Sequence, residues 1–395
     1  MRNEKGSLIR PVSLPASASR PVVTPLSPSV VYASETPDQL DAQYEGHLHG
    51  YTYSREGHPN ADVVAARLDA MEGQSGGTVT GSGMAAVTAA LMGLLSAGDH
   101  VIGGNQLYGR SLRLMKEDLP RLGITTSLAD PGDVAAIKAA ITPQTKMILI
   151  EVVSNPTLRV ADVKGIADLA KAHGILLAVD NTFTTPRSFR PYDYGADIVI
   201  HSLTKLLAGH SDVMLGYVSA RDLDLSQKMR VFAVTTGLSA SPFDCWLCER
   251  GMLSFDLRYD RAQDTAIRLA DHLATLKGVK RVIYPGRADH PDAARARELL
   301  GAQTCNMVSF KLDGGRAAAN AFTRAADGLS FAPTLGDVGT TLSHPASSSH
   351  RALSVDERAA LGLSEGFFRV SVGLEDPDAL MAVFTDAVAA TRDLA

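Results

Sequence analysis

Residues 178–216 read AVDNTFTTPRSFRPYDYGADIVIHSLTKLLAGHSDVMLG, and this stretch decides the fold. An apolar run ends at Asp180, and the next one, Asp197–Ile200, is followed by His201-Ser202-Leu203-Thr204-Lys205. In an open α/β sheet, ligands bind at the carboxyl ends of the strands. We therefore expect a carboxylate, two hydroxyls and an amine to meet a ligand at one edge of a sheet.

Short apolar runs that are typical of buried strands continue on both sides of this stretch and alternate with helical patterns. The expected strands of this part are Thr78–Thr80, His100–Gly103, Met147–Val153, Ile175–Val179 and Ile198–Ile200. This alternation predicts a mostly parallel sheet that is covered by helices on both faces. We assign residues 63–255 to such an α/β domain.

The flanking regions have different patterns. Residues 1–62 are rich in proline, serine and threonine, which predicts an extended arm that packs on another surface. A long helical pattern over Phe255–Leu276 looks like a connector. Residues 256–395 then mix expected strands and helices, which predicts a smaller α+β domain. The expected elements there are strands Val282–Tyr284, Met307–Leu312 and Phe367–Val372 and helices Gly315–Arg324 and Asp378–Arg392.

Composition excludes several classes of protein. The 395 residues are 45% hydrophobic and 21% charged, with a formal net charge of −5, so neither disorder nor binding to nucleic acid or an anionic membrane is expected. No apolar span approaches transmembrane length, and Met1–Arg20 lacks the apolar core of a signal peptide. Three cysteines fit a reducing compartment, and we expect the cytoplasm.

The spacing of Cys245 and Cys248 admits half of a zinc site or a redox pair. Nothing nearby completes such a site, so we interpret the two cysteines as apolar residues on one helix face and expect no metal.

The residues around Lys205 suit a phosphorylated pyridine aldehyde. A lysine condenses with an aldehyde, provided that its surroundings disfavour the charged amine. Asp180 would hold a proton on the pyridine nitrogen, which makes the ring an electron sink, and Ser202 and Thr204 would donate to the phosphate. The competing interpretation is a solvated lysine and an aspartate in a turn.

A glycine-rich turn supports the first interpretation. Gly81-Ser82-Gly83-Met84 joins an apolar run to an Ala/Leu-rich helix, and glycines let backbone amides at a helix N-terminus approach an anion. The same string is also compatible with an ordinary turn. Its weight comes from its combination with Lys205 and Asp180.

Several strings, in order from about residue 30 to the C-terminus, resemble the Cys/Met-metabolism enzymes that use pyridoxal phosphate (PLP). They are YTYSREGHPN, GSGMAA, LYGRSLR, SNPT, VDNTF, ADIVIHSLTKLLAGHSD, SHPAS and FRVSVGLED. The family includes cystathionine γ-synthase, cystathionine lyases, methionine γ-lyase and homoserine sulfhydrylases. The resemblance implies the fold type I of PLP enzymes, in which a large α/β domain carries a smaller C-terminal α+β domain.

The resemblance also implies roles for individual residues. Lys205 matches the lysine that forms the Schiff base, Asp180 the partner of the pyridine nitrogen, and Tyr108 the tyrosine that stacks on the ring and assists proton transfer. Gly83, Met84, Ser202 and Thr204 match the phosphate cradle, and Tyr53 and Arg55 match a pair that reaches the phosphate of a neighbouring subunit. The family therefore implies a homo-oligomer, with a dimer as the minimum and a tetramer as the expected state.

Other matches concern the substrate, a small amino acid. Asn155 and Arg369 match groups that hold the α-carboxylate, with Asn155 also near the ring hydroxyl, and Thr334 is placed with them. Without the motif, Arg369 would read as a surface arginine on a strand. Arg113 lies where relatives often bind a distal carboxylate.

Four residues depart from the family pattern. Arg110, which we place among the substrate-binding residues, stands where many relatives have glycine and methionine γ-lyases have cysteine, which speaks against a plain methionine γ-lyase. Gly339 replaces a frequent glutamate, which speaks against ordinary cystathionine handling. His58 and Asn60 replace the usual asparagine and threonine.

These residues leave three functions open. The first is a lyase that eliminates a β- or γ-substituent and releases a 2-oxo acid and ammonia, of the cystathionine γ-lyase or methionine γ-lyase kind. The second is a γ-replacement transferase of the cystathionine γ-synthase or homoserine sulfhydrylase type. The third is a non-catalytic binding protein that keeps the fold.

Overall fold

A computed structural model describes residues 17–351 and 353–394, so the first sixteen residues of the expected arm lie outside the described part. Its larger sheet has seven strands in the order β1-β7-β6-β5-β4-β2-β3. The strands are β1 Thr78–Thr80, β2 His100–Gly104, β3 Thr125–Ala129, β4 Thr145–Glu151, β5 Leu176–Asp180, β6 Ile198–Ser202 and β7 Gly216–Ala220. In this sheet β7 runs opposite to the other six strands, so it pairs antiparallel with β1 and β6, and the remaining pairs are parallel, which confirms the mostly parallel sheet.

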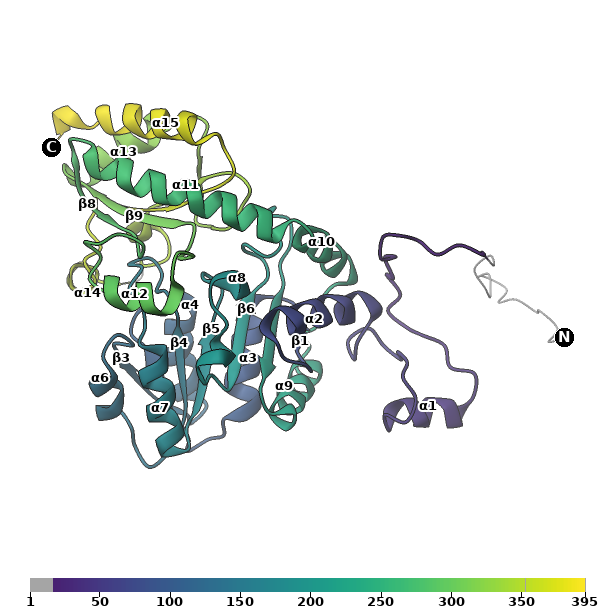
Figure 1. The fold of residues 1–395 in the computed structure, drawn as a ribbon. Helices are drawn as coiled ribbons and strands as arrows, with labels where there is room; N and C mark the ends of the chain where they lie inside the picture. Colours follow the sequence, from purple (N-terminus) through teal and green to yellow (C-terminus); the bar gives the residue numbers. More distant parts are fainter. Residues whose placement is uncertain (1–16, 352, 395) are drawn as a thin grey trace.

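Helices cover both faces of this sheet because successive strand residues point to opposite sides (Figure 1). Met147, Leu149 and Ile200 pack with helices α3 and α9 on one face, whereas Ile148 and Val179 pack with α6 and α7 on the other. The helices of this part are α2 Pro59–Glu72, α3 Gly83–Leu94, α4 Gly109–Arg113, π-helix η1 Leu114–Asp118, α5 Leu119–Arg121, α6 Val134–Ala139, α7 Val163–His173, α8 Thr185–Ser188, 3₁₀ helix η2 Pro191–Tyr194, α9 Leu223–Thr235 and α10 Pro242–Met252.

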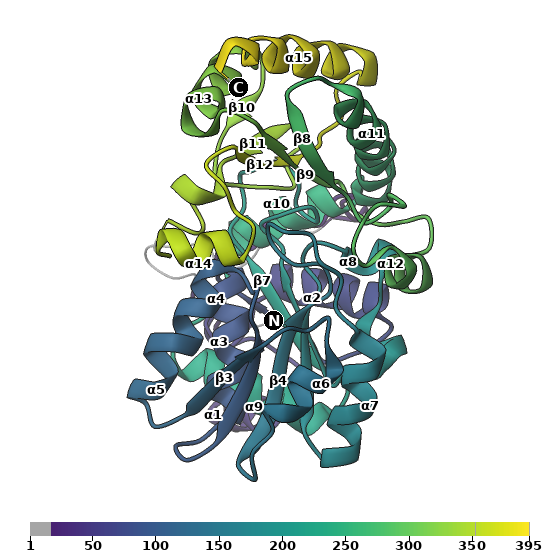
Figure 2. The ribbon, with the colours of Figure 1, turned by 90° about the vertical axis from the view of Figure 1, so that its left-hand side faces the viewer.

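A second sheet lies above the carboxyl ends of the first (Figure 2), with five strands in the order β10-β11-β12-β9-β8. The strands are β8 Val279–Ile283, β9 Met307–Leu312, β10 Ser330–Phe331, β11 Thr341–Ser343 and β12 Phe367–Ser371. The predicted connector is helix α11, Phe255–Thr275. The other helices here are α12 Ala293–Leu300, α13 Gly315–Ala325, 3₁₀ helix η3 Pro345–Ser347, α14 Val355–Ala360, α15 Pro377–Ala389 and 3₁₀ helix η4 Arg392–Leu394.

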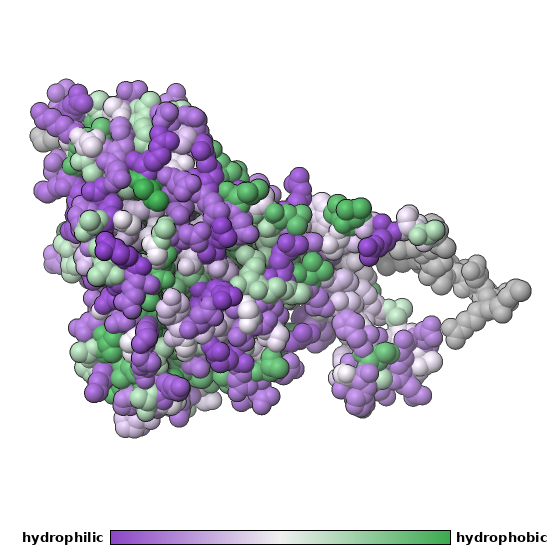
Figure 3. Space-filling view, viewed as in Figure 1, coloured by the Kyte–Doolittle hydropathy of each residue, from purple (hydrophilic) through white to green (hydrophobic). Residues whose placement is uncertain are grey.

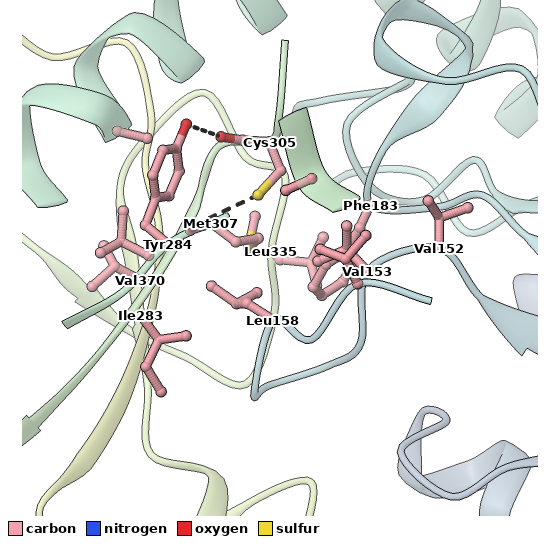
Figure 4. Close-up of a cluster of buried hydrophobic side chains, with 14 of the residues drawn as sticks. Val152, Val153, Leu158, Phe183, Ile283, Tyr284, Cys305, Met307, Leu335 and Val370 are labelled. Carbon is pink, nitrogen blue, oxygen red and sulfur yellow. Dashed lines mark hydrogen bonds between the residues drawn. The ribbon is translucent and has the colours of Figure 1, made fainter. Parts of the chain in front are cut away.

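One hydrophobic cluster runs without a break between the two sheets. Val152 and Leu158 follow β4 and belong to the same buried cluster as Met307 and Leu335 from the C-terminal part, and Leu158 lies beside Met307 and Leu335 (Figure 4). The hydroxyl of Tyr284 donates to the carbonyl of Cys305 at 3.0 Å and so satisfies a polar group in this buried region. The shared core fixes the two sheets relative to each other, and the division at residues 255 and 256 stays a prediction.

The described part of the N-terminal arm leaves the body on the side of α2 and α10. Helix α1, Pro37–Tyr44, and the start of α2 at Pro59 lie within the stretch expected to be extended (Figure 1). Asn60 anchors the arm: its Nδ2 donates to the carbonyl of Pro25 at 3.0 Å. The Nδ1 of His58 accepts from the backbone N–H of Ala61 and caps α2. The two atypical residues therefore serve structural contacts. No helix in the described ranges is long and apolar enough to cross a membrane.

Candidate active site

A cavity of about 1050 Å³ opens at the carboxyl ends of β4, β5 and β6 and is closed from above by residues of the second sheet. It brings together most of the residues singled out from the sequence, although they lie far apart in the chain. Those residues are Gly83, Met84, Tyr108, Arg110, Arg113, Asn155, Asp180, Ser202, Thr204, Lys205, Thr334 and Arg369.

Strand register sets the floor of this cavity. Glu151 on β4 is paired with Asp180 on β5, and Asp180 with Ile200 on β6, two residues before Ser202. Because side chains alternate along a strand, Glu151, Asp180 and Ser202 share the face that is covered by α3. Polar groups on three neighbouring strands therefore line up where the apolar strand residues end.

Lys205 follows β6 and is half-buried. Within the part of the chain that the structure describes, its Nζ has neither a hydrogen bond nor an ion pair. Burial lowers the pKa of Lys205, and repulsion from Arg369 lowers that pKa further. Both effects favour the neutral amine, which is the form that attacks an aldehyde.

Asp180 is supported by Thr182. Oδ1 of Asp180 accepts from the backbone N–H of Thr182 at 3.0 Å and from its hydroxyl at 2.5 Å. The hydroxyl oxygen of Thr182 in turn accepts from the backbone N–H of Ser202 at 2.9 Å. Burial raises the pKa of Asp180, while the hydrogen bonds from Thr182 and the nearby His201 act in the opposite direction. Thr182, which the sequence interpretation did not single out, thus ties the carboxylate to β6.

The glycine turn forms a close-fitting end of the cavity. Ser82 caps α3 by accepting from the backbone N–H of Ala85 at 3.1 Å. A Cβ at Gly83 would lie 2.7 Å from Cβ of Ser202, so only glycine brings this helix N-terminus so near to β6. Free N–H groups at the start of a helix favour an anion.

The two hydroxyls that were expected to bind phosphate differ in the structure. The Thr204 hydroxyl donates to the carbonyl of Leu215 at 3.2 Å and accepts from the Leu215 N–H at 3.1 Å. The Ser202 hydroxyl has no hydrogen bond among the described residues. Ser202 is therefore the better placed of the two to donate to a ligand.

Arg369 is a buried cation whose partners are neutral. Its Nη1 donates to Oδ1 of Asn155 at 2.6 Å, and its Nη2 donates to the carbonyl of Thr334 at 2.7 Å, while its buried Nε has no partner in the described structure. Burial lowers the pKa of Arg369 to about 10, and the pKa of the adjacent His350 falls to about 4 through burial and the arginine charge. A buried guanidinium without an acidic partner suits a bound carboxylate.

Glu151 is a second residue that sequence reasoning missed. Its Oε1 accepts from the backbone N–H of Tyr108 at 2.7 Å, at the start of α4, and its Oε2 is buried without a partner in the described part of the chain. Burial raises the pKa of Glu151 well above its usual range, and the charge of Asp180 adds to this rise. The only sequence signal was a carboxylate inside an apolar run.

The mouth of the cavity is positively charged. Arg113 pairs with Glu117 at 3.2 Å, whereas Arg110 and Arg351 have no charged partner in the described ranges. The carbonyl of Ser349 lies 2.5 Å from the position that a Cβ of Gly109 would take, so the segment before Arg351 packs directly on α4. Gly339 does not line the cavity.

Tyr53 and Arg55 are not brought to the cavity of their own chain. Tyr53 is exposed in the arm, where its backbone pairs with Val31, and Nη1 of Arg55 donates to the carbonyl of Val234 at 3.2 Å.

The residues of this cavity fit pyridoxal phosphate. A lysine with a lowered pKa, a buried carboxylate and an anion-binding helix start are the groups that its aldehyde, ring nitrogen and phosphate require. Arg369 lines the same cavity, where its guanidinium suits the carboxylate of an amino acid.

Comparison with known proteins shows which enzymes this chain is similar to. L-methionine gamma-lyase from Pseudomonas putida is 37% identical over 94% of this chain and 93% of its own length. Cystathionine beta-lyase from Bacillus subtilis is 40% identical over 86% of each chain. The structure of cystathionine gamma synthase from Xanthomonas oryzae pv. oryzae in complex with aminoacrylate and cysteine superimposes with a TM-score of 0.90, at 34% identity, covering 95% of this chain and 94% of that one. Residues 7–389 match one protein family across nearly the whole chain. The chain therefore belongs to the Cys/Met metabolism PLP-dependent enzymes.

Proposed function

We propose that this protein is a PLP-dependent lyase that eliminates a β- or γ-substituent from a sulfur-containing or related amino acid and releases a 2-oxo acid and ammonia. The observation that carries this proposal is that the buried guanidinium of Arg369 has no acidic partner in the described structure and lies in the same cavity as Lys205 and Asp180. Such a cavity accepts an α-amino acid by its carboxylate and presents the reacting atoms to an amine.

The proposed roles follow from the positions of the side chains. Bound PLP supplies an electron sink that stabilises negative charge at the substrate α-carbon. Asp180 stays ionised and holds the proton on the ring nitrogen. Arg369 and Asn155 orient the substrate carboxylate, and Lys205 removes the α-proton through Nζ once that amine is free. Tyr108 lines the same cavity and would pack on the bound cofactor and pass a proton toward the leaving group.

The substrate that we favour has an acidic far end. Arg110 and Arg351 have no charged partner in the described structure, and Glu117 is the one acid that lines the mouth, where it pairs with Arg113. A distal carboxylate on the leaving group would therefore meet unpaired guanidinium groups. Thr334 contributes its backbone carbonyl to Arg369 and so acts on the substrate indirectly.

A γ-replacement transferase is the second candidate, because the Xanthomonas oryzae relative is a cystathionine gamma synthase. Purified holoenzyme incubated with cystathionine, methionine, cysteine or acylated homoserines separates the two candidates. We expect 2-oxo acid and ammonia without an added thiol. Keto acid or product that forms only when a thiol is supplied would favour the transferase. Protein without the absorption of bound cofactor, or with absorption unchanged by Lys205→Ala, would favour a binding protein.

We further propose that the working unit is a homo-oligomer, with a dimer as the minimum and a tetramer as the expected state. Tyr53 and Arg55 lie away from their own cavity, as residues that serve a neighbouring subunit would. Leu257, Leu253 and Phe243 are 77%, 67% and 52% exposed, and hydrophobic surface gathers around α10 and the adjoining end of α11 (Figure 3). Light scattering coupled to gel filtration tests this, and a fully active monomer would contradict it.

For the compartment, we propose the cytoplasm. The three cysteines are buried and free, as is usual in a reducing environment.

A further inference from the structure

Glu151 occupies a position that the proposed chemistry does not explain. It ends β4, lines the cavity, and is paired in register with Asp180 at the end of β5. Strands in a sheet lie about 4.8 Å apart, so two carboxyl groups on the same face of paired positions are close neighbours. Two adjacent buried carboxylates cannot both be ionised without a large cost, so the pair is expected to hold a proton.

Hydrogen bonds decide which of the two carries the charge. Asp180 receives two hydrogen bonds from Thr182, both at Oδ1. Oε1 of Glu151 accepts from the Tyr108 N–H at 2.7 Å, and the backbone N–H of Asn155 also acts on this carboxyl group and opposes the rise of its pKa, whereas Oε2 is buried without a hydrogen-bond partner in the described residues. A carboxylate oxygen that has no donor is the natural place for a proton. The ionised form is therefore better supported at Asp180.

We propose that Glu151 is a positioning residue that works as an uncharged carboxylic acid: its Oε1 fixes the backbone at Tyr108, and its protonated Oε2 leaves the negative charge of the pair on Asp180. This rests on the proposed PLP chemistry, in which Asp180 must stay ionised and Tyr108 must lie over the ring.

Several other ionisable groups lie around Glu151 and Asp180, but none of them is hydrogen-bonded to Oε2 of Glu151 in the described residues. Lys205 after β6, Arg369 on β12 and Tyr108 before α4 line the same cavity, and Arg110, Arg113, Glu117 and Arg351 line its mouth. His201 lies on the opposite face of β6, where its Nε2 is hydrogen-bonded to Glu72 at 2.5 Å. Burial, and secondly the charge of Asp180, raise the pKa of Glu151, in agreement with the geometry.

Three substitutions separate the two parts of the proposal. Glu151→Gln keeps an oxygen for the Tyr108 N–H and has no charge, so kcat/KM should fall less than about tenfold. Glu151→Ala loses the acceptor for the Tyr108 N–H, so its kcat/KM should fall much further. It should also bind the cofactor more weakly, as measured by titration of the apoprotein. The kcat/KM of Asp180→Asn should fall by more than about 10²-fold, because the negative charge next to the ring nitrogen is lost. Glu298→Gln, on the exposed side of α12, is the matched control.

Two readouts do not depend on turnover. Infrared difference spectra of the full-length wild-type protein at neutral pH should contain a protonated-carboxyl band that is missing from Glu151→Gln. A raised native pKa means that stability is complete below the unfolded pKa of about 4.3 and is lost as pH rises through the native pKa. The melting temperature of Glu151→Gln apoprotein should therefore fall less between about pH 5 and 8 than that of wild type.

Certain results would overturn the proposal. If Glu151→Gln lost as much activity as Asp180→Asn while both variants kept wild-type circular dichroism, Glu151 would be the charged member. If Gln were no better than Ala, its contact with Tyr108 would have no positioning role. Neither result would touch the proposed lyase function, which stands or falls on keto acid release by the wild-type enzyme.

Discussion

Arg369 on β12 and Asn155 after β4 are joined by a hydrogen bond of 2.6 Å between Nη1 and Oδ1. This bond links the second sheet to the loop that follows the first sheet, directly across the cavity. The two residues are 214 positions apart in the chain, so the site that they form exists only when both sheets are in place. The two residues proposed to bind the substrate carboxylate are therefore held together only when the two sheets pack against each other.

The first prediction concerns this pair. Arg369→Ala should lower kcat/KM by on the order of 10²-fold or more, since loss of a buried charge partner costs about 2–5 kcal/mol. Arg369→Lys keeps the charge but loses the planar fork and should lie between wild type and Ala. Steady-state kinetics measure this, with the exposed Arg268→Ala as the control. Equal kinetics for Arg369→Ala and wild type would remove Arg369 from the substrate site.

The second prediction concerns the amine. Because repulsion from Arg369 helps to lower the pKa of Lys205, Arg369→Ala should raise that pKa and reduce the fraction of free amine at a given pH. The rate at which apoprotein captures PLP should therefore follow a pH profile displaced to higher pH. Arg369→Lys keeps the charge and should leave the profile near that of wild type. Lys205→Ala gives the background rate, and a profile that is the same in Arg369→Ala would contradict the electrostatic coupling.

The third prediction concerns Thr182, whose hydroxyl joins Asp180 to the backbone of Ser202. Thr182→Val keeps the shape but removes both hydrogen bonds. A hydrogen bond to a charged group contributes about 1.5–3 kcal/mol, so cofactor affinity should drop by roughly 10- to 100-fold. Thr182→Ser should restore most of it, because the hydroxyl returns. Fluorescence titration of the apoprotein measures the affinity, and equal losses in Val and Ser would point to packing as the cause.

The sequence predicted the part of the site whose residues directly follow a strand in the chain. Asp180 and the Ser202–Lys205 segment follow apolar runs directly, so their place at strand ends could be predicted from the order of residues. Glu151 was hidden because Val152 and Val153 are also buried, so the apolar run continues after the strand has ended. Backbone hydrogen bonding, which hydrophobicity does not report, sets that boundary.

Strands that are very short or partly exposed were missed for a related reason. β3 begins with two threonines and a serine, and its first four residues are exposed or partly exposed, so it lacks a continuous apolar run. β10 has two residues and is stabilised only by its pairing with β11. Arg351 was missed because its approach to α4 depends on contact between Ser349 and Gly109, which are distant in sequence. Long-range packing of this kind leaves no local pattern.

The last prediction concerns the mouth of the cavity. Arg110→Gly and Arg351→Ser each remove a guanidinium that has no charged partner in the described structure, and neither arginine is among the residues proposed to hold the cofactor. For a substrate whose leaving group bears a carboxylate, such as cystathionine or O-succinylhomoserine, KM should rise by roughly 2- to 5-fold, because an exposed ion pair contributes up to about 1 kcal/mol.

For methionine, whose far end is neutral, KM should change less than about twofold, since no distal charge is lost. This difference between substrates is the measurement that matters, because a general disturbance of the pocket would affect both. Salt provides a second check: a few hundred millimolar salt should raise KM for the acidic substrate more than KM for methionine in wild type, and this gap should narrow when Arg110→Gly and Arg351→Ser are combined in one protein. Parallel changes for both substrates would show that the arginines at the mouth shape the pocket without selecting an acidic leaving group.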